Sequence, residues 1–263
     1  LERLGLRPRR DLGQNFLIDG NIVRKSLELA AVRPSDTVIE VGPGLGTLTR
    51  GLLAAGATVY AVEVDAALAR YLRDALGAFP QFRLTEGDAC ERPLAGFEPG
   101  PAAASYKIVA NLPYAIATPW IDAVLSQPTL PERIVVLVQR EAADRMMGQP
   151  GSKAMGAIAV FLEAACERRP GHPVAASCFQ PAPRVDSVLF HLERKAEPYR
   201  FAAATKSIIR GLFTQRRKQV RSLSRQFLPA GVAAAWLEAL ESASASPTDR
   251  PEALPFAAWR ALD

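Results

Sequence analysis

Residues 37–46 read TVIEVGPGLG and join an apolar run to a glycine-rich turn. The continuous β-branched and apolar residues of 37–41 predict a strand buried on both faces, and the glycines that follow end it. The stretch 47–55 then has helical spacing and reaches Gly56, a residue type common at helix C-termini. A buried strand, a tight turn and a helix in this order are typical of a parallel α/β sheet.

The same alternation continues over the first 150 residues. Further strands are predicted at 58–63, 82–86, 107–110 and 133–138, further helices at 66–75 and from Thr118, and loops at 91–105 and 149–152. A late apolar run at 187–192 predicts one more strand, which we expect to pair antiparallel. These patterns predict an α/β fold with a mostly parallel sheet that is covered by helices on both faces.

After Glu193 the sequence no longer alternates between strand and helix patterns. Residues 198–263 have helical patterns throughout, with turn signals at Pro229, Ser246-Pro247 and Pro255. We therefore expect two domains, an α/β domain over 1–195 and a small all-helical domain over 196–263.

Composition narrows the classes of function. No apolar run reaches the roughly 20 residues that cross a bilayer, and no signal peptide is visible, so we expect a cytoplasmic protein without a membrane segment. The chain opens on Leu1, and we expect its native start to lie upstream. Three isolated cysteines and two histidines form no ligand cluster, which predicts free thiols and no metal site. The net charge of +5 fits a nucleic-acid partner without establishing one.

Polar groups stand at the ends of four predicted strands. The glycine turn follows Glu40 in the first strand, and Glu63 ends the second. Asp88 follows the third strand and Asn111 the fourth. Positions 40, 63, 88 and 111 are 23, 25 and 23 residues apart, which is about one strand–helix unit each. We therefore expect these groups to line one edge of the sheet, where ligands of open α/β sheets bind.

The residue types at this edge predict a cofactor that contains adenosine. Glu63 can accept from both ribose hydroxyls, and Asp88 can accept from an adenine amine. The turn reads GxGxG rather than the GxGxxG of dinucleotide folds, because Thr47 takes the place of the third glycine. Glycines alone also fit a strand–helix turn without a ligand, but with the two acids in phase S-adenosylmethionine fits best, at Gly42 and Gly44.

The tetrapeptide Asn111-Leu112-Pro113-Tyr114 follows the fourth strand. It offers a side-chain carbonyl, a backbone carbonyl and an aromatic ring, which are the groups needed to hold a planar exocyclic amine. Accepting both amine hydrogens of adenine pulls the nitrogen toward sp3 and frees its lone pair to attack a methyl group. Taken alone the tetrapeptide equally fits a plain turn ahead of a helix, but its place at this edge favours catalysis.

A second aromatic candidate lies in residues 177–187, SCFQPAPRVDS. Pro181 and Pro183 fix an extended loop. This loop can hold the ring of Phe179 opposite that of Tyr114, so that the two rings stack on the two faces of a flipped base. In isolation this segment is better explained by a core phenylalanine beside a rigid loop.

Residues 205–225 contain seven basic side chains and no acid. At helical spacing Arg210, Arg217 and Arg221 share a stripe, while Leu212 and Val220 can face a core. A solvated helix face is the ordinary explanation of such a run, but the absence of any balancing acid favours contact with RNA phosphates. The residues expected to bind RNA are Arg210, Arg216, Arg217, Lys218 and Arg221.

Seven motifs, in this order, resemble those of the ribosomal RNA adenine N6,N6-dimethyltransferases. They are LGQNFL at 12–17, EVGPGLG at 40–46, EVD at 63–65, GDA at 87–89, NLPY at 111–114, FxPxPxVDS at 179–187 and QRRK at 215–218. The resemblance covers nearly the whole chain. It implies a Rossmann-like class I methyltransferase fold with a mostly parallel seven-stranded sheet and a small C-terminal all-helical domain.

The resemblance also implies the cofactor and the roles of residues. S-adenosyl-L-methionine would be bound by Gln14, Asn15, Leu17, Gly42, Gly44, Glu63, Asp88, Ala89 and Asn111. Asn111 and the carbonyl of Leu112, in a turn completed by Pro113, would receive the amine, and Tyr114 and Phe179 would flank the base. No general base is expected, because the amine proton becomes acidic only after transfer.

Three branches of this family compete. Bacterial small-subunit enzymes modify two adjacent adenines in a hairpin loop near the 3′ end of 16S RNA, macrolide-resistance enzymes modify one adenine of 23S RNA, and organellar relatives act on the small subunit or in transcription. Segments 152–156, 215–218 and 250–254 resemble the small-subunit branch. We therefore expect a monomeric enzyme whose partner is the small ribosomal subunit. An inactive assembly factor is disfavoured by the intact acids and Asn111, and a DNA methyltransferase by Leu112.

Overall fold

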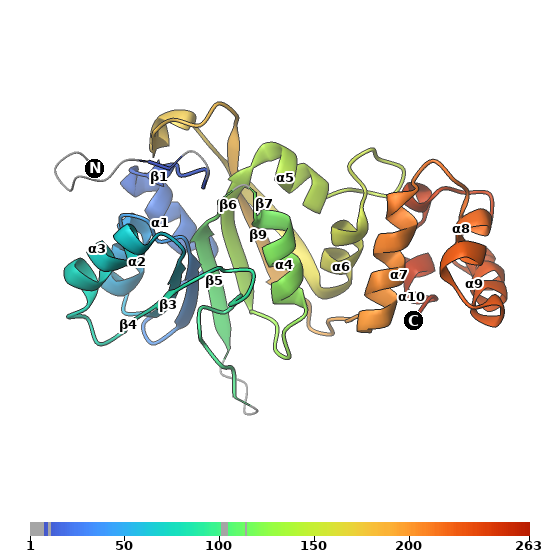
Figure 1. Ribbon diagram of the computed structural model, residues 1–263, viewed down its shortest axis with the longest axis horizontal. Coiled ribbons are helices and arrows are strands. Elements are labelled where there is room, and N and C mark those ends of the chain that lie inside the picture. Colours follow the sequence, from blue (N-terminus) through green and yellow to red (C-terminus); the bar gives the residue numbers. More distant parts are fainter. Residues whose placement is uncertain (1–7, 10–11, 101–104, 114) are drawn as a thin grey trace. The chain divides into compact units, whose positions relative to one another are not determined.

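The computed structural model describes residues 8–9, 12–100, 105–113 and 115–263 (Figure 1). The chain divides into two compact units. One consists of residues up to Ala143 together with Arg168–Arg194, and the other of Asp144–Glu167 together with Lys195–Asp263.

The first unit carries a seven-stranded sheet with the order β4-β3-β2-β5-β6-β9-β7. The strands are β2 (Thr37–Val41), β3 (Thr58–Glu63), β4 (Phe82–Glu86), β5 (Tyr106–Asn111), β6 (Arg133–Gln139), β7 (Cys166–Val174) and β9 (Ser187–Arg194). The four pairs from β4 to β6 are parallel, and β9 pairs antiparallel with β6. The predicted mostly parallel sheet and the antiparallel late strand are confirmed.

Strand β7 has no counterpart in the sequence prediction. Its sequence, CERRPGHPV, mixes charged residues with two prolines and a glycine, so it lacks the apolar pattern of a buried strand. It occupies the end of the sheet order. An edge strand tolerates proline, because one of its rows of N–H groups has no strand to pair with.

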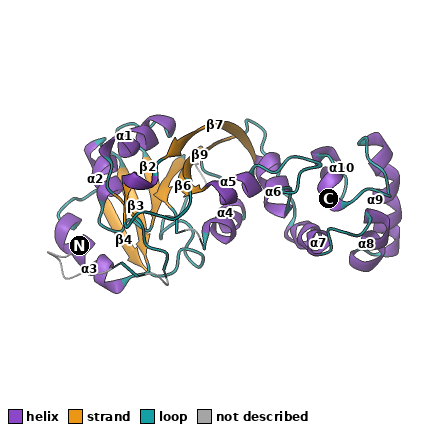
Figure 2. Cartoon of the chain, turned by 90° about the horizontal axis from the view of Figure 1, so that it is seen from above, coloured by secondary structure: helices purple, strands orange, loops and turns teal. Residues whose placement is uncertain are grey.

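Helices cover both faces of this sheet (Figure 2). Helices α1 (Gly20–Leu29), α2 (Thr47–Ala54) and α3 (Ala66–Leu76) lie on one side, and α4 (Ala117–Leu125) lies on the other. Helix α5 (Arg140–Met146) follows β6. Two short strands, β1 (Phe16–Leu17) and β8 (Phe179–Gln180), form a separate antiparallel pair, and a 3-10 turn at Ala176–Cys178 precedes β8.

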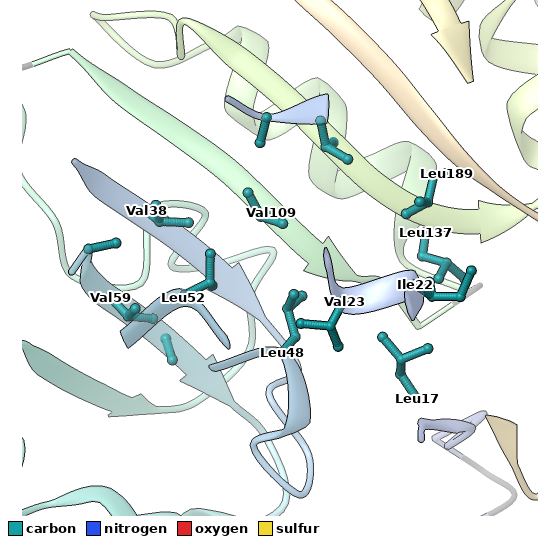
Figure 3. Close-up of a cluster of buried hydrophobic side chains, with 14 of the residues drawn as sticks. Leu17, Ile22, Val23, Val38, Leu48, Leu52, Val59, Val109, Leu137 and Leu189 are labelled. Carbon is teal, nitrogen blue, oxygen red and sulfur yellow. The ribbon is translucent and has the colours of Figure 1, made fainter. Parts of the chain in front are cut away.

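A hydrophobic cluster lies between the sheet and the first three helices (Figure 3). Alternate residues of adjacent strands, such as Val38, Val59 and Val109, are fully buried there. They pack with Ile22 of α1 and Leu52 of α2. Burial of apolar surface contributes about 25 cal/mol per Å², so this layer stabilises the unit.

The second unit is helical. It contains α6 (Ala157–Ala165), α7 (Ala203–Thr214), α8 (Val220–Phe227), α9 (Ala230–Ser242), a 3-10 turn at Pro251–Ala253 and α10 (Phe256–Arg260). Trp236 and Trp259 are buried at its centre, where the ring of Phe213 stacks on Trp259 with 5.2 Å between centroids. The indole of Trp236 donates to the carbonyl of Ala258 at 2.8 Å.

The division differs from the domain boundary expected at 195/196. The change of unit falls between Arg194 and Lys195, one residue before the expected position, and residues 144–167 group with the C-terminal helices rather than with the sheet. The reason lies in the apolar helix α6, where Phe161 packs against Phe201 at 5.9 Å between ring centroids. Sequence order alone did not indicate this contact, because about 40 residues separate the two rings.

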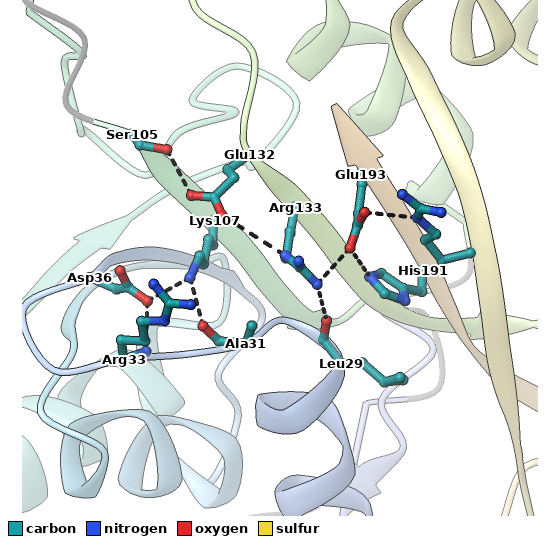
Figure 4. A network of polar contacts seen from close by, with 11 residues as sticks. Leu29, Ala31, Arg33, Asp36, Ser105, Lys107, Glu132, Arg133, His191 and Glu193 are labelled. Atoms are coloured by element: carbon teal, nitrogen blue, oxygen red, sulfur yellow. Dashed lines mark hydrogen bonds and ion pairs between the residues drawn. The ribbon is translucent and has the colours of Figure 1, made fainter. Parts of the chain in front are cut away.

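Two cations, the buried Lys107 and the half-buried Arg133, hold the C-terminal end of α1 (Figure 4). The ammonium of Lys107 donates to the carbonyl of Ala31 at 2.7 Å and lies 2.8 Å from a carboxylate oxygen of Asp36. The guanidinium of Arg133 donates to the carbonyl of Leu29 at 3.1 Å. Cations suit this end of a helix, where carbonyls lack intrahelical partners. Both cations come from the beginnings of strands, at the edge opposite the predicted ligand edge.

We predict that Lys107→Met lowers the free energy of unfolding by about 2–3 kcal/mol, because it leaves Asp36 and a buried carbonyl without their cation. Urea unfolding measures the difference. The matched control is Lys25→Met, whose ion pair with the exposed Glu28 has side-chain exposures of 32% and 68% and should be worth less than about 0.5 kcal/mol. Equal effects of the two substitutions would contradict a structural role for Lys107.

Candidate active site

A cavity of about 220 Å³ lies at the edge where β2, β3, β4 and β5 end. The parallel register aligns Val41 with Val62 and Glu63 with Glu86, which brings the strand ends level. The cavity is lined by every residue expected to bind the cofactor, namely Gln14, Asn15, Leu17, Gly42, Gly44, Glu63, Asp88, Ala89 and Asn111. Leu112 and Pro113 line it as well, so the structure brings cofactor and target candidates into one cavity.

The glycine turn gives this cavity its shape. Gly42, Gly44 and Gly46 all have positive φ angles, of 63°, 58° and 75°. Glycine adopts this left-handed region at little cost. At Gly44 a Cβ atom would also lie 2.9 Å from the ring of Phe16, so any side chain there would collide with the N-terminal segment.

Glu63 joins this turn to the next strand. The side chain is 4% exposed, and its two oxygens accept from the N–H groups of Gly44 at 3.1 Å and Asp65 at 3.0 Å. Burial raises the pKa of Glu63, although these two hydrogen bonds oppose the rise. Each carboxylate oxygen has a second lone pair, which leaves acceptor capacity for a ligand in the cavity.

Glu40 is a cavity residue to which the sequence analysis gave no role. It is 1% exposed, lines the cavity from β2, and its Oε2 has no hydrogen-bond partner among the described residues. Burial raises the pKa of Glu40 to about 8, with the charge of Glu63 adding to the rise and Thr49 opposing it. An acid inside an otherwise apolar strand, two residues before a glycine turn, is the sequence signal that could have identified it.

Asp88 differs from these two acids because it is exposed. One of its oxygens accepts from the N–H of Cys90 at 2.7 Å. The cavity therefore has two buried carboxyls, Glu40 and Glu63, on one side and an exposed acid on another. This set of acceptors fits a ligand that carries both positive charge and hydroxyl groups.

Asn111 ends β5 at the same edge. Its Nδ2 donates to the backbone carbonyl of Asn15 at 2.9 Å. The following residue, Leu112, is 1% exposed, and its N–H donates to the carbonyl of Leu137 at 3.1 Å. Tyr114, whose ring is expected to stack on the target base, lies outside the described residues.

Phe179 lies outside the lining of this cavity. Its ring is 1% exposed, belongs to the main hydrophobic cluster and is not among the residues that line the cavity. The pairing of Phe179 with Leu17 explains this position, because both side chains of this pair are buried in the same cluster. Phe179 is thus a buried core residue in this structure, as its segment alone also suggested, and its contact with a target base stays a prediction.

The basic run in the helical unit is also arranged differently from the prediction. Helix α7 ends at Thr214 and α8 begins at Val220, so Arg210, Arg217 and Arg221 do not share one helix and the predicted stripe is wrong. The interruption follows from Val220, which is buried and donates its N–H to the carbonyl of Asp249.

The individual basic side chains have different surroundings. Arg217, Lys218 and Arg221 are exposed. Arg210 is exposed too, but its guanidinium lies 5.3 Å from the ring centroid of Phe161. Arg216 is half-buried and donates to the carbonyl of Lys153 at 3.0 Å, so part of its capacity is used within the unit.

No helix in the described part of the chain is long and apolar enough to cross a membrane. Within the same residues, no group of three His, Cys, Asp or Glu side chains is arranged to hold a metal ion.

The sheet order, the glycine turn and the acids at successive strand ends define a Rossmann-like methyltransferase fold. Comparison with solved structures agrees. The chain is similar to the 23S rRNA methyltransferase ErmE, with a TM-score of 0.68 and 27% identity over 94% of this chain and 98% of that one. A dimethyladenosine transferase from Plasmodium falciparum shares the fold, with a TM-score of 0.76 and 23% identity over 94% and 95% of the two chains.

The chain belongs to the ribosomal RNA adenine dimethylase family, whose model matches residues 5–243. A relative from Opitutus terrae, named ribosomal RNA small subunit methyltransferase A, is 58% identical over all of this chain and 94% of its own length. A relative of the same name from Streptomyces coelicolor is 42% identical over 95% of this chain and 88% of its own.

The raised pKa of Glu40 makes stability depend on pH. Its folded pKa of about 8 exceeds the ordinary value of 4.5, so its contribution is complete below pH 4.5 and is lost as the pH rises to about 8 and beyond. In that window the slope is up to about 1.4 kcal/mol per pH unit.

We predict that Glu40→Gln, which keeps the shape without the ionisation, loses less stability than the wild type between pH 5 and 8. Urea unfolding at several pH values measures the difference between the two proteins. Glu28→Gln, at an exposed position on α1, is the control and should follow the wild type. Parallel curves for Glu40→Gln and the wild type would contradict burial of a protonated acid.

Proposed function

We propose that this chain transfers methyl groups from S-adenosylmethionine to the N6 amine of adenine in small-subunit (16S) ribosomal RNA and forms N6,N6-dimethyladenine. The observation that carries the proposal is the shared cavity, in which Glu63 and Asp88 stand beside Asn111. Family membership supports the reaction, and the names of the relatives support the small subunit as substrate. Two adjacent adenines near the 3′ end of this RNA are the expected target, in the cytoplasm.

The cavity residues fit this cofactor. Glu63 offers carboxylate oxygens to the ribose hydroxyls, and Asp88 offers one to the adenine amine. The turn at Gly42 and Gly44 lets the backbone approach the methionine end closely. The buried carboxyl of Glu40 suits the positive charge of the ligand, because burial disfavours the ionised form of this acid and a nearby cation stabilises it. Gln14, Asn15, Leu17 and Ala89 complete the wall of this part of the cavity.

S-adenosylmethionine supplies a methyl group on a positively charged sulfur. The side-chain carbonyl of Asn111 and the backbone carbonyl of Leu112 would accept the two amine hydrogens and aim the nitrogen lone pair at that methyl group. These dipoles also stabilise the positive charge that develops on the nitrogen. Orientation of this kind, rather than acid–base chemistry, provides the rate. Pro113 shapes the turn, and Tyr114 would contact the face of the base.

We assign RNA binding to the exposed basic residues of the helical unit. Arg217, Lys218 and Arg221 lie in and after the turn between α7 and α8, and Arg210 is exposed on α7. Arg216 has contacts within the unit and would position this turn. Phosphates attract such a group without reading sequence.

Transfer of labelled methyl groups tests the activity. We expect purified small subunits lacking the modification to accept label, with dimethyladenosine found after digestion, and unmodified large subunits to accept little. Asn111→Ala should reduce transfer at least 100-fold, on the scale of a lost transition-state acceptor of about 3 kcal/mol, while calorimetry shows little change in cofactor affinity. Preferential labelling of large subunits would replace the proposal with a 23S-type activity.

Salt dependence tests the RNA surface. We predict that the double substitution Arg217→Ala, Arg221→Ala reduces the slope of log K against log salt by about 1.4–1.8, since each lost phosphate contact removes about 0.7–0.9. Filter binding of small-subunit RNA at several salt concentrations measures it. The control Arg50→Ala, which removes an exposed cation from α2, should leave the slope unchanged. An unchanged slope for the double variant would show that Arg217 and Arg221 do not contact RNA phosphates.

A further inference from the structure

We propose that the backbone carbonyl of Asn15 orients the amide of Asn111, which makes residues 14–18 a positioning segment for the transfer step. The proposal rests on the proposed function, in which the Oδ1 of Asn111 accepts from the adenine amine. It adds a role for the chain's N-terminal segment that is separate from binding the cofactor.

The contact itself selects one orientation of the amide. A primary amide has a donor end and an acceptor end of nearly the same shape. The Nδ2 of Asn111 donates to the Asn15 carbonyl at 2.9 Å. The reversed amide would place two acceptor oxygens at this distance, which is repulsive. The carbonyl therefore keeps Oδ1 on the other side of the amide, free to accept an amine hydrogen.

The carbonyl can act in this way because the segment is held on both sides. Before it, the Nε2 of Gln14 donates to a carboxylate oxygen of Asp65 at 3.2 Å, just past the end of β3. After it, Phe16 is buried with its ring against Gly44 in the turn that follows β2.

The next residues extend this anchoring. Leu17 pairs with Phe179 of β8, and the N–H of Ile18 donates to the carbonyl of Cys178 at 2.9 Å. The side chain of Asp19 then caps α1 by accepting from the N–H of Asn21 at 2.7 Å.

The five residues 14–18 thus contact the ends of β2, β3 and β5 and the strand β8. Asp65, the partner of Gln14, also caps α3 by accepting from the N–H of Ala67 at 2.9 Å, so the anchor itself is fixed. The same segment contributes Gln14, Asn15 and Leu17 to the cavity wall. A single short stretch of backbone therefore joins the expected cofactor site to the acceptor of the target amine.

The substitution Asn111→Asp tests the orientation. An ionised carboxylate has no hydrogen to donate, so it would face the Asn15 carbonyl with an acceptor and turn away. A protonated carboxyl can donate to that carbonyl and still offer its other oxygen to the amine. We expect the ratio of kcat in this variant to kcat in the wild type to fall about tenfold per pH unit above the pKa of the new carboxyl. At pH 8 the ratio should approach that of Asn111→Ala.

An unoriented site gives a different result. If the Asn111 nitrogen had no role, a carboxylate would be the stronger acceptor, and the ratio would be independent of pH and close to or above one. That outcome would overturn the proposal. The control Asn21→Asp adds the same charge at an exposed position on α1, and its ratio should not change with pH. Cofactor affinity and thermal unfolding, measured at each pH, separate the effect from loss of binding or folding.

The closing comparison separates the two proposals. If Asn111→Ala is inactive while the Asn111→Asp ratio is flat, the orienting role fails and the proposed function stands. If Asn111→Ala retains activity, both the acceptor role of Asn111 and the orienting role of Asn15 fail.

Discussion

Parallel strand pairing is the constraint on which the rest of this structure depends. Because β2, β3, β4 and β5 run in one direction, the turn that follows each strand lies at the same edge of the sheet. Residues that are more than 20 positions apart in sequence, such as Glu63 and Asp88, therefore line one cavity. The hydrophobic layer under the first three helices holds the strands in register, so the geometry of the cavity follows from core packing.

Charge is distributed differently at the two edges of the sheet. At the edge opposite the cavity, the cations Lys107 and Arg133 have carbonyls and carboxylates as partners, so their positive charge is compensated within the protein. At the cavity, Glu40 keeps an oxygen without a partner among the described residues. Burial of an unpaired acid lowers stability, and a cationic ligand would relieve that cost. Under the proposed function, the positively charged cofactor would provide that relief.

In the helical unit, too, some side chains make contacts within the fold, while other charged side chains remain exposed. In its core the ring of Phe213 stacks on Trp259 and the indole of Trp236 donates a hydrogen bond to the carbonyl of Ala258, and Val220 fixes the start of α8. The turn that results leaves Arg217 and Lys218 exposed, while Arg216 is tied back to the carbonyl of Lys153. Neighbouring basic residues therefore differ in their surroundings. Arg216 contacts the unit itself, whereas Arg217 and Lys218 present their charge to solvent.

The sequence by itself determined the strand–turn–helix order, the common edge of Glu63, Asp88 and Asn111, and the family, because these depend on local patterns and on regular spacing. Tertiary structure alone decided the features that depend on contacts between distant segments. It placed β7 at the sheet edge, residues 144–167 with the C-terminal helices, and Phe179 in the core through its pairing with Leu17. It also brought the Asn15 carbonyl to Asn111, a contact across 96 positions of sequence. A backbone carbonyl has no residue type, so no motif in the sequence can indicate it.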